Sequence, residues 1–173
     1  LPAHVTEMSA DGISYVKLID ATPIGIIVRS TVATYVGIHD ELRKLFARTE
    51  DAKAKGYKAG DFSYNTGNLR CVGCDGTGTI NLDVQFLPDV DIPCPDCRGS
   101  RYRREAYGIR FGRNNPYSLP EIMDMDVCSA YDFFEKEGTK PVLQKLSVLK
   151  QLGLGYLTLG EETPGLSGGE AQR

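Results

Sequence analysis

The sequence Cys71-Val72-Gly73-Cys74 is followed, after 19 intervening residues, by a second cysteine pair in Cys94-Pro95-Asp96-Cys97. A spacing of two residues lets both thiolates of a pair bind one ion, and two such pairs complete a tetrahedral four-cysteine zinc site. The separation between the pairs lies in the range typical of zinc modules. We therefore expect one structural Zn²⁺ per chain, bound by Cys71, Cys74, Cys94 and Cys97.

Other uses of these cysteines fit the pattern less well. Two disulfides would need an oxidising compartment, and the N-terminal residues do not form a secretory signal. Four inert thiols would leave the repeated spacing unexplained. A catalytic zinc keeps one coordination position open for water, whereas four thiolate ligands would fill all four positions. The fifth cysteine, Cys128, falls in a helical pattern, where we expect a small buried apolar residue.

The residues between the two pairs alternate polar and apolar side chains from Thr79 to Leu87, the pattern of a half-buried strand. Pro88-Asp89 then turns the chain, so the pattern predicts a short β-hairpin that leaves the zinc site. Because the module is too small for a core of its own, the zinc would hold its shape and order the root of the segment that follows Cys97.

Around this module the sequence predicts an α+β fold of helices and short β-hairpins. We expect strands at residues 14–20 and 106–111, and helices at 40–48, 126–136 and 141–151. Asp40 is the predicted N-cap of the first helix. Residues 51–68 should be mostly loop, with three aromatic side chains that suit either anchoring to a core or contact with nucleic-acid bases: Tyr57, Phe62 and Tyr64.

The net charge of −3 conceals a strongly basic segment. Residues 98–113 contain six arginines and a single acid, Glu105. A surface field depends on where charge lies, so a basic segment can bind nucleic acid although the whole chain is acidic. We expect the phosphates of double-stranded DNA to contact Arg98, Arg101, Arg103 and Arg104. The alternative is a solvated basic face that pairs with neighbouring acids.

The composition is that of an ordinary globular protein, with 41% hydrophobic and 25% charged residues. No apolar run approaches the length of a membrane-spanning helix, so we expect a cytoplasmic protein without a membrane partner. Leu1 is not a start methionine and the chain stops at Arg173 without an evident ending, so we expect a piece of a longer protein.

The C-terminal residues Leu166-Ser167-Gly168-Gly169-Glu170 have the pattern of a capped helix start, with Glu170 three residues after Ser167. A cap does not require two glycines, but close approach of an anion to free backbone N–H groups would explain them. The chain contains no Gly-x4-Gly-Lys-[Ser/Thr] phosphate loop and neither histidine has an evident partner. We therefore expect no catalytic residue and no isolated activity.

The run Leu166 to Glu170 resembles the signature motif of ATP-binding-cassette ATPases. Read with Phe86-Leu87-Pro88-Asp89-Val90, the cysteine pairs and Leu152-Gly153-Leu154-Gly155-Tyr156, the chain resembles the UvrA family of DNA-repair ATPases. The resemblance implies that residues 1–35 are a remnant of the second ATP-binding cassette, that 36–166 form the signature domain with an inserted zinc module at 71–105, and that 167–173 are the signature motif. The implied ATP contacts are Ser167, Gly168, Gly169 and Glu170.

The resemblance also implies a function. The family recognises damaged DNA in nucleotide excision repair, part of the SOS response, and loads the B component of the excinuclease at the lesion. The family acts as a dimer, and the signature motif of one half contacts ATP that the phosphate loop of another half holds. The resemblance therefore implies that ATP and Mg²⁺ bind only in the full-length dimer. The 173-residue chain lacks the Walker A and Walker B motifs and should be inactive as an ATPase by itself.

Two departures leave alternatives open. The family's Asp-Gln-Ser-Pro-Ile-Gly loop, which senses ATP and magnesium, reads Asp20-Ala21-Thr22-Pro23-Ile24-Gly25, and Ile26-Ile27-Val28 replaces Arg-Thr-Pro. These changes put coupling at that site in doubt and suggest a paralogue that protects against DNA-binding drugs. A further alternative is a protein-binding zinc module of the DnaJ type, of whose four repeats the chain has one full copy and one partial copy.

Overall fold

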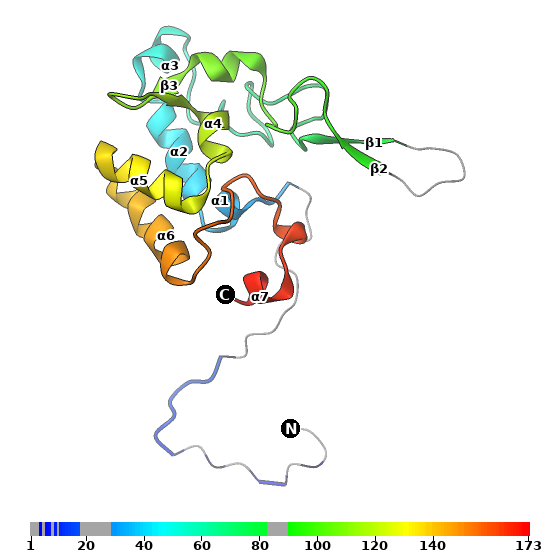
Figure 1. The fold of residues 1–173 in the computed structure, drawn as a ribbon, viewed down its shortest axis with the longest axis vertical. Helices are drawn as coiled ribbons and strands as arrows, with labels where there is room; N and C mark the ends of the chain where they lie inside the picture. Colours follow the sequence, from blue (N-terminus) through cyan, green and yellow to red (C-terminus); the bar gives the residue numbers. More distant parts are fainter. Residues whose placement is uncertain (1–3, 5, 8, 10, 18–28, 83–89) are drawn as a thin grey trace.

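Two helices lie side by side, and each contributes three buried residues to the core (Figure 1). α5 (Val127–Glu137) begins after the N-cap Asp126, whose carboxylate accepts a backbone N–H of the first turn, and ends at Gly138 with a left-handed φ of +73°. α6 (Lys140–Gln151) follows at once, with Pro141 in its first turn, where proline is tolerated. Both predicted helices are confirmed to within one residue at each end.

The structure is a computed structural model that describes residues 4, 6–7, 9, 11–17, 29–82 and 90–173. Among these residues, no helix combines the length and the apolar composition that crossing a lipid bilayer requires. The remaining helical elements are short: α1 (Val32–Tyr35), α2 (Ile38–Phe46), α3 (Glu50–Ala54), α4 (Leu119–Met123), α7 (Gly168–Gln172) and the 3-10 helices η1 (Arg104–Gly108) and η2 (Thr163–Gly165).

The start of α2 differs from the prediction. Its N-cap is Gly37, which has a φ of +72°, so the helix begins at Ile38 and Asp40 lies in the first turn. Lys145 on α6 donates to the carbonyl oxygens of Val36 and Gly37 at 3.2 and 2.9 Å. Asp40 as N-cap is therefore wrong: the N-cap lies three residues earlier, at a left-handed glycine whose carbonyl a lysine on another helix binds.

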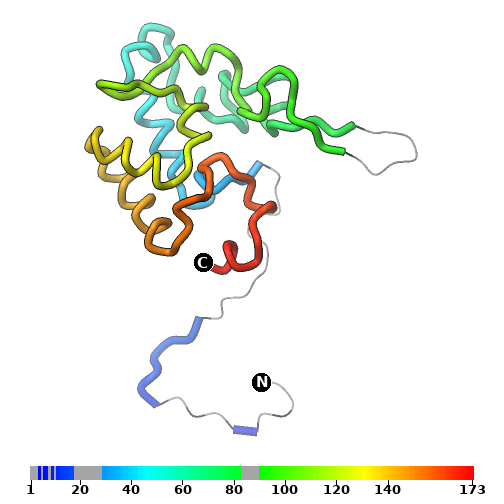
Figure 2. The backbone as a smooth tube through the Cα atoms, viewed as in Figure 1, coloured from blue at the N-terminus to red at the C-terminus, as the bar shows by residue number. Residues whose placement is uncertain are grey.

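The strands form two small antiparallel pairs. β1 (Thr79–Leu82) pairs with β2 (Val90–Pro93) in the hairpin that projects from the helical body (Figure 2). β3 (Arg110–Phe111) pairs with β4 (Tyr117–Ser118). The hairpin between the cysteine pairs is confirmed. The turn predicted at Pro88-Asp89 and the loop at 20–28 lie outside the described residues.

Two predicted strands are wrong in whole or in part. Residues 14–17, the described part of the strand predicted at 14–20, form no strand. In the strand predicted at 106–111, the chain first forms η1 through Gly108, and only Arg110 and Phe111 are extended. The hydrogen bond from Ile109 N to Ala106 O, at 3.3 Å, closes this turn and shortens the strand.

The loop aromatics belong to the core. The side chains of Phe62 and Tyr64 are completely buried, and Phe62 packs against Phe46 of α2 with ring centroids 5.8 Å apart. Tyr57 is half-buried and meets the edge of Phe62. Of the two roles open to these residues, anchoring the loop to the core is therefore the correct one, and Phe62 and Tyr64 are not exposed to nucleic acid.

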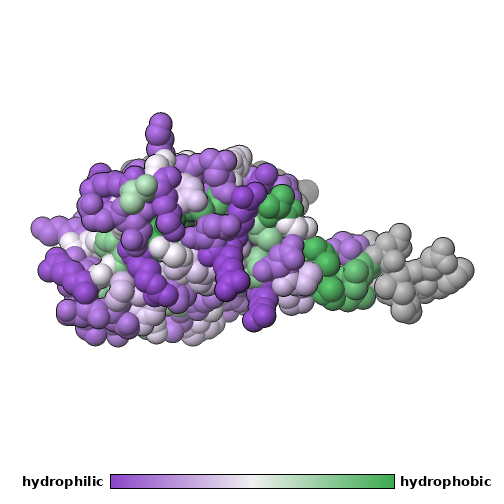
Figure 3. All heavy atoms as spheres, turned by 90° about the horizontal axis from the view of Figure 1, so that it is seen from above, coloured by the Kyte–Doolittle hydropathy of each residue, from purple (hydrophilic) through white to green (hydrophobic). Residues whose placement is uncertain are grey.

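Cys128 is exposed, contrary to the prediction. The buried residues of α5 are Val127, Ala130 and Phe134, and they direct Cys128 away from the core. The face shown in Figure 3 is mostly hydrophilic, with apolar surface on the projecting hairpin. Leu82 and Val90, which are paired across the hairpin, are exposed there.

Candidate metal centre and signature motif

The four cysteine thiols predicted as metal ligands meet in one buried cluster. Cys71 Sγ lies 3.9 Å from Cys94 Sγ, Cys74 Sγ lies 3.6 Å from Cys97 Sγ, and all four sulfurs lie within 4.8 Å of one another. Zinc–sulfur bonds of roughly 2.3 Å in a tetrahedron place the sulfurs about 3.8 Å apart, whereas a disulfide needs about 2.05 Å. The spacing fits one tetrahedral ion, and all four cysteines are free thiols.

The two cysteine pairs are built in the same way. In each, the second cysteine is followed by two residues with left-handed backbone: Asp75 and Gly76 after the first pair, Arg98 and Gly99 after the second. This turn points backbone N–H groups back toward the sulfurs, and Gly78 N donates to Cys74 Sγ at 3.2 Å. The repeated cysteine spacing is thus matched by a repeated turn.

Burial and hydrogen bonds act in opposite directions on the acidity of the thiols. Burial raises the pKa of Cys97 to about 12. Burial also acts to raise the pKa of Cys74, but hydrogen bonds from the Gly78 N–H and the neighbouring thiols outweigh it and lower the pKa to about 7. Because thiolates are the ligands, a divalent cation at this cluster would replace protons that the buried thiols otherwise retain.

The module is inserted into the body through a paired entrance and exit. Arg70 and Tyr102 form an antiparallel bridge, Cys71 N donates to Arg101 O at 2.9 Å, and Arg103 N donates to Leu69 O at 2.9 Å. These bonds hold the two ends of the module beside one another.

Ion pairs fix the first cysteine turn to the body. Asp75 accepts from Arg29 at 2.6 Å and from Arg70 at 2.8 Å, which holds the pKa of Asp75 below its usual value. Gly76 packs so tightly that an added Cβ would lie 1.8 Å from Tyr64 O. Sequence reasoning did not identify these contacts, because they join residues that carry no shared motif.

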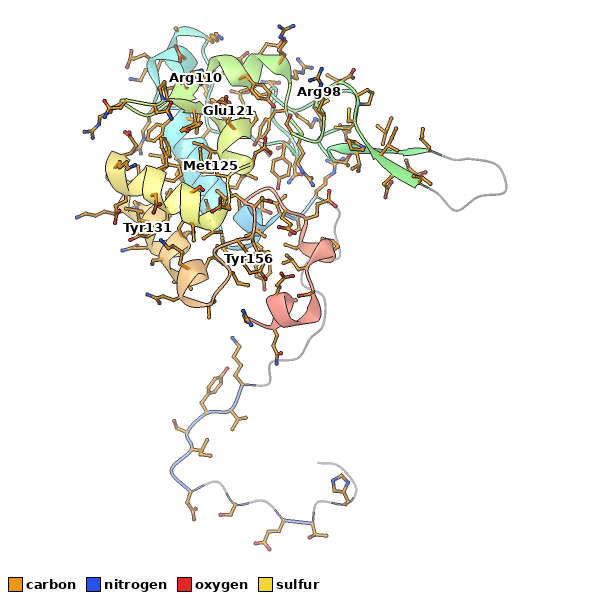
Figure 4. The ribbon with its side chains drawn as sticks, in the orientation of Figure 1. Arg98, Arg110, Glu121, Met125, Tyr131 and Tyr156 are labelled. Atoms are coloured by element: carbon orange, nitrogen blue, oxygen red, sulfur yellow. The ribbon has the colours of Figure 1, made fainter. Side chains whose placement is uncertain are left out.

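The four arginines predicted to contact DNA do not form one surface. Arg98, Arg103 and Arg104 are exposed, and in the described part of the chain none of them pairs with a carboxylate. Arg98 projects near the root of the hairpin in Figure 4. Arg101 is instead buried, and its Nη2 donates to Glu162 Oε1 at 2.6 Å. The buried position of Arg101 does not suit contact with a phosphate.

Two other arginines of the basic segment form ion pairs with acidic side chains, as in the alternative of a solvated basic face. Arg110 lies 3.5 Å from Glu121, near which it is seen in Figure 4, and Arg113 lies 3.7 Å from Glu137. These pairs neutralise the end of the basic segment, so the arginines of the segment that have no carboxylate partner among the described residues are Arg98, Arg103 and Arg104.

The predicted signature residues begin a short helix. Ser167 is the N-cap of α7: its hydroxyl accepts from Glu170 N at 3.3 Å, and Glu170 Oε2 accepts from Ser167 N at 2.7 Å, as in the expected capping box. Gly168 and Gly169 are exposed. A Cβ added to Gly169 would meet nothing within 4 Å, so packing does not require glycine at that position.

A residue outside the motif holds it in place. The Tyr156 hydroxyl donates to Glu170 Oε1 at 2.5 Å, and this bond lowers the pKa of the Glu170 carboxyl. Figure 4 shows Tyr156 beside α7. Nothing in the sequence around Tyr156 marked this contact, because the two residues are joined only through the tertiary fold.

Comparisons with known proteins place these features in a family. No protein-family model matches the chain. The UvrABC system protein A of Aquifex aeolicus is 45% identical over 163 residues, which is 94% of this chain and 17% of that protein. The protein of the same name from Streptomyces coelicolor is 41% identical over 174 residues, covering all of this chain and 17% of its own length.

A solved structure agrees with the sequence comparisons. The crystal structure of UvrA2 from Deinococcus radiodurans superposes with a TM-score of 0.80 and 42% identity, over 89% of this chain and 18% of that one. The chain thus spans less than a fifth of the relatives it matches. Over nearly its whole length, the chain is homologous to UvrA and corresponds to one part of that protein.

Proposed function

We propose that the chain is the DNA-binding, zinc-containing part of a UvrA-type ATPase that recognises damaged DNA in nucleotide excision repair. The observation that carries the proposal is that exposed arginines, without a carboxylate partner among the described residues, follow the last of four thiols at tetrahedral spacing. Arg98 follows the ligand Cys97 without a break, and Arg103 donates from Nε to Arg70 O at 3.0 Å. The proposed site therefore has positive charge on a backbone that the metal would order.

The proposed metal is one structural Zn²⁺. Cys71, Cys74, Cys94 and Cys97 would supply all four ligands, which leaves no position for a catalytic water. The ion would hold the two turns together and so fix where the arginines begin.

The proposed DNA contacts are to phosphates. Arg98, Arg103 and Arg104 would bind the backbone of a duplex, which gives affinity without base specificity. That property suits a protein that must examine any sequence and respond to how readily the duplex deforms. Arg101 is not part of this surface.

The signature motif supports a role in a larger ATPase. In this proposal residues 1–35 belong to the second ATP-binding cassette, 36–166 form the signature domain with the zinc module at 71–105, and 167–173 contact ATP. Gly168 and Gly169 would leave backbone N–H groups open to the nucleotide, with Ser167 and Glu170 shaping the turn.

The rest of the proposal concerns the whole protein. ATP and Mg²⁺ would bind only in the full-length dimer, which would load the B component of the excinuclease at a lesion in the cytoplasm during the SOS response. The 173-residue chain has no phosphate loop and should hydrolyse no ATP by itself.

A second candidate function is resistance to DNA-binding drugs in a UvrA-like paralogue. The observation in its favour is the altered run Asp20-Ala21-Thr22-Pro23-Ile24-Gly25. The identities of 41–45% to UvrA proteins and 42% to UvrA2 do not separate the two candidates. Restoration of ultraviolet resistance to a repair-deficient strain by the full-length gene would favour repair, whereas resistance to an intercalating drug alone would favour the paralogue.

The experiment that tests the proposal measures metal content and duplex binding together. We expect about one zinc per chain and DNA binding that is lost when a chelator removes the zinc. A chain that binds no zinc, or that binds duplex DNA equally with and without it, would contradict the proposal.

A further inference from the structure

Arg101 has a side chain that is only 6% exposed, although it lies in the most basic segment of the chain. Its Nη2 donates to Glu162 Oε1 at 2.6 Å and its Nη1 donates to Gly76 O at 3.4 Å. The guanidinium also lies over the ring of Tyr64, with Cζ 5.3 Å from the centroid. Three segments that are remote in sequence therefore converge on one arginine.

The backbone of Arg101 belongs to the metal site. Its N–H hydrogen-bonds the thiol of Cys97, and its carbonyl accepts from Cys71 N at 2.9 Å. Its φ is +70°, a conformation that is unfavourable for a residue with a Cβ and that the surrounding contacts must hold. The backbone of this one residue thus touches a cysteine of each pair, while the side chain leaves the module.

Glu162 lies 61 residues further along the chain, at the start of the segment that leads to α7. It forms an antiparallel bridge with Thr31, flanked by the hydrogen bonds from Val32 N to Glu161 O at 2.9 Å and from Thr163 N to Ser30 O at 3.0 Å. Glu162 is also the N-cap of η2, and Leu166 is the C-cap of this short helix. Ser167, the first residue of the predicted signature contacts, follows Leu166 directly. Its position therefore influences where the signature motif begins.

We propose that the Arg101–Glu162 ion pair links zinc binding at the four-cysteine site to the order of residues 158–166. Glu162 is then a positioning residue for the metal site and for this segment. The inference rests on the proposed function only in taking zinc as the metal. Zinc fixes Cys71 and Cys97, these fix the Arg101 backbone, and the guanidinium holds Glu162. Because such linkage is reciprocal, weakening the pair at Glu162 must also weaken zinc binding.

The test compares two neutralising substitutions in the 173-residue chain. Glu162→Gln keeps the size and an oxygen acceptor but removes the charge that pairs with Arg101. Glu161→Gln makes the same charge change one residue away, where the carboxylate accepts from Thr158 N at 3.3 Å and forms no ion pair with a described residue. Competition with a chelator measures the zinc affinity of each.

We expect Glu162→Gln to bind zinc about tenfold more weakly, the lower end of the effect of residues that support metal ligands. Glu161→Gln should bind zinc as the wild type does. If the pair is the link, adding Glu162→Gln to Arg101→Gln should cause no further loss. In the zinc-loaded state, the amide protons of Val32 and Thr163 should exchange faster in Glu162→Gln than in Glu161→Gln, because they flank the Thr31–Glu162 bridge.

Equal zinc affinity and equal amide exchange in both variants would overturn this inference while leaving the proposed metal site intact. Additive losses in the double variant would also overturn it, since the two residues would then act separately. A wild-type chain that binds no zinc would overturn the proposed metal function as well.

Discussion

His39 Nε2 lies 2.8 Å from the hydroxyl oxygen of Tyr102, and both side chains are buried. The Tyr102 hydroxyl donates to Phe62 O at 2.9 Å, so it accepts the N–H of His39. Burial lowers the pKa of His39 to about 4, and the ring is therefore neutral near pH 7. Through this chain of hydrogen bonds, the segment that leaves the zinc module is anchored to α2.

Acid should destabilise the fold through His39. The pKa of His39 is about 4 in the folded chain, where the ring is buried, and 6.5 when the ring is free in water. As the pH falls, the unfolded chain therefore binds the proton at a higher pH than the folded chain does. The contribution to stability is complete above pH 6.5 and is lost as the pH falls toward 4. Between pH 7.5 and pH 5, we expect this group to lower the free energy of unfolding by about 2 kcal/mol, measured by urea denaturation.

The control for this prediction is His39→Gln, which keeps a donor for Tyr102 but does not titrate. Protonation of the thiols also changes zinc occupancy at low pH, but it does so in both proteins. The difference in pH dependence between wild type and variant therefore isolates His39, and identical pH profiles would show that the prediction is wrong.

Gly76→Ala should destabilise the chain strongly. The added Cβ would meet Tyr64 O at 1.8 Å, and the φ of +78° disfavours any side chain. We expect a loss of about 3 kcal/mol or more in denaturation of the zinc-loaded protein. Gly99→Ala is the matched control, because its φ is +91° and the space around it is open, so only about 1–2 kcal/mol of backbone strain should appear. Equal losses would contradict the close packing of the first cysteine turn.

Tyr156→Phe should loosen α7 without unfolding the protein. It removes the hydroxyl that donates to Glu170, both residues being on the surface. We expect severalfold faster amide exchange in α7 and an unchanged global free energy of unfolding. Since the hydrogen bond lowers the pKa of Glu170, protonation of Glu170 at acid pH should loosen α7 of the wild type in the same way. The exposed Tyr35 supplies the control: exchange in α7 that responds equally to Tyr35→Phe would argue against a specific contact.

The parts of the fold that depend on local pattern could be predicted from the sequence. The spacing of the cysteines brings Cys71 and Cys97 into one cluster, since two-residue turns and a connecting hairpin leave few other arrangements. The helices at 126–136 and 141–151 were also predictable, because apolar periodicity agrees with the proline and glycine at their ends.

The parts that depend on distant partners could not be predicted. The burial of Arg101 requires Glu162, and the start of α2 requires Lys145 on a different helix. The side-chain identity of Arg101 suggests a surface cation, whereas its left-handed backbone and its ion pair with Glu162 accompany a buried side chain. The prediction for Cys128 is wrong for a different reason. Cys128 lies one position beside the buried face of α5, which Val127, Ala130 and Phe134 form, and it therefore faces solvent.

The most direct test of the proposed DNA interface is the salt dependence of duplex binding. The triple variant Arg98→Ala/Arg103→Ala/Arg104→Ala removes the exposed arginines that have no carboxylate partner among the described residues, while Arg110→Ala/Arg113→Ala removes two that pair with Glu121 and Glu137. Zinc content should be the same in both, since none of these side chains is a ligand.

Fluorescence anisotropy of a labelled duplex between about 50 and 200 mM salt gives the slope of log affinity against log salt concentration. We predict that the triple variant lowers the steepness of this slope by roughly 3, close to one unit for each lost phosphate contact, and that the control variant changes it little. A triple variant with the wild-type slope and affinity would contradict the assignment of Arg98, Arg103 and Arg104 as the DNA-binding surface.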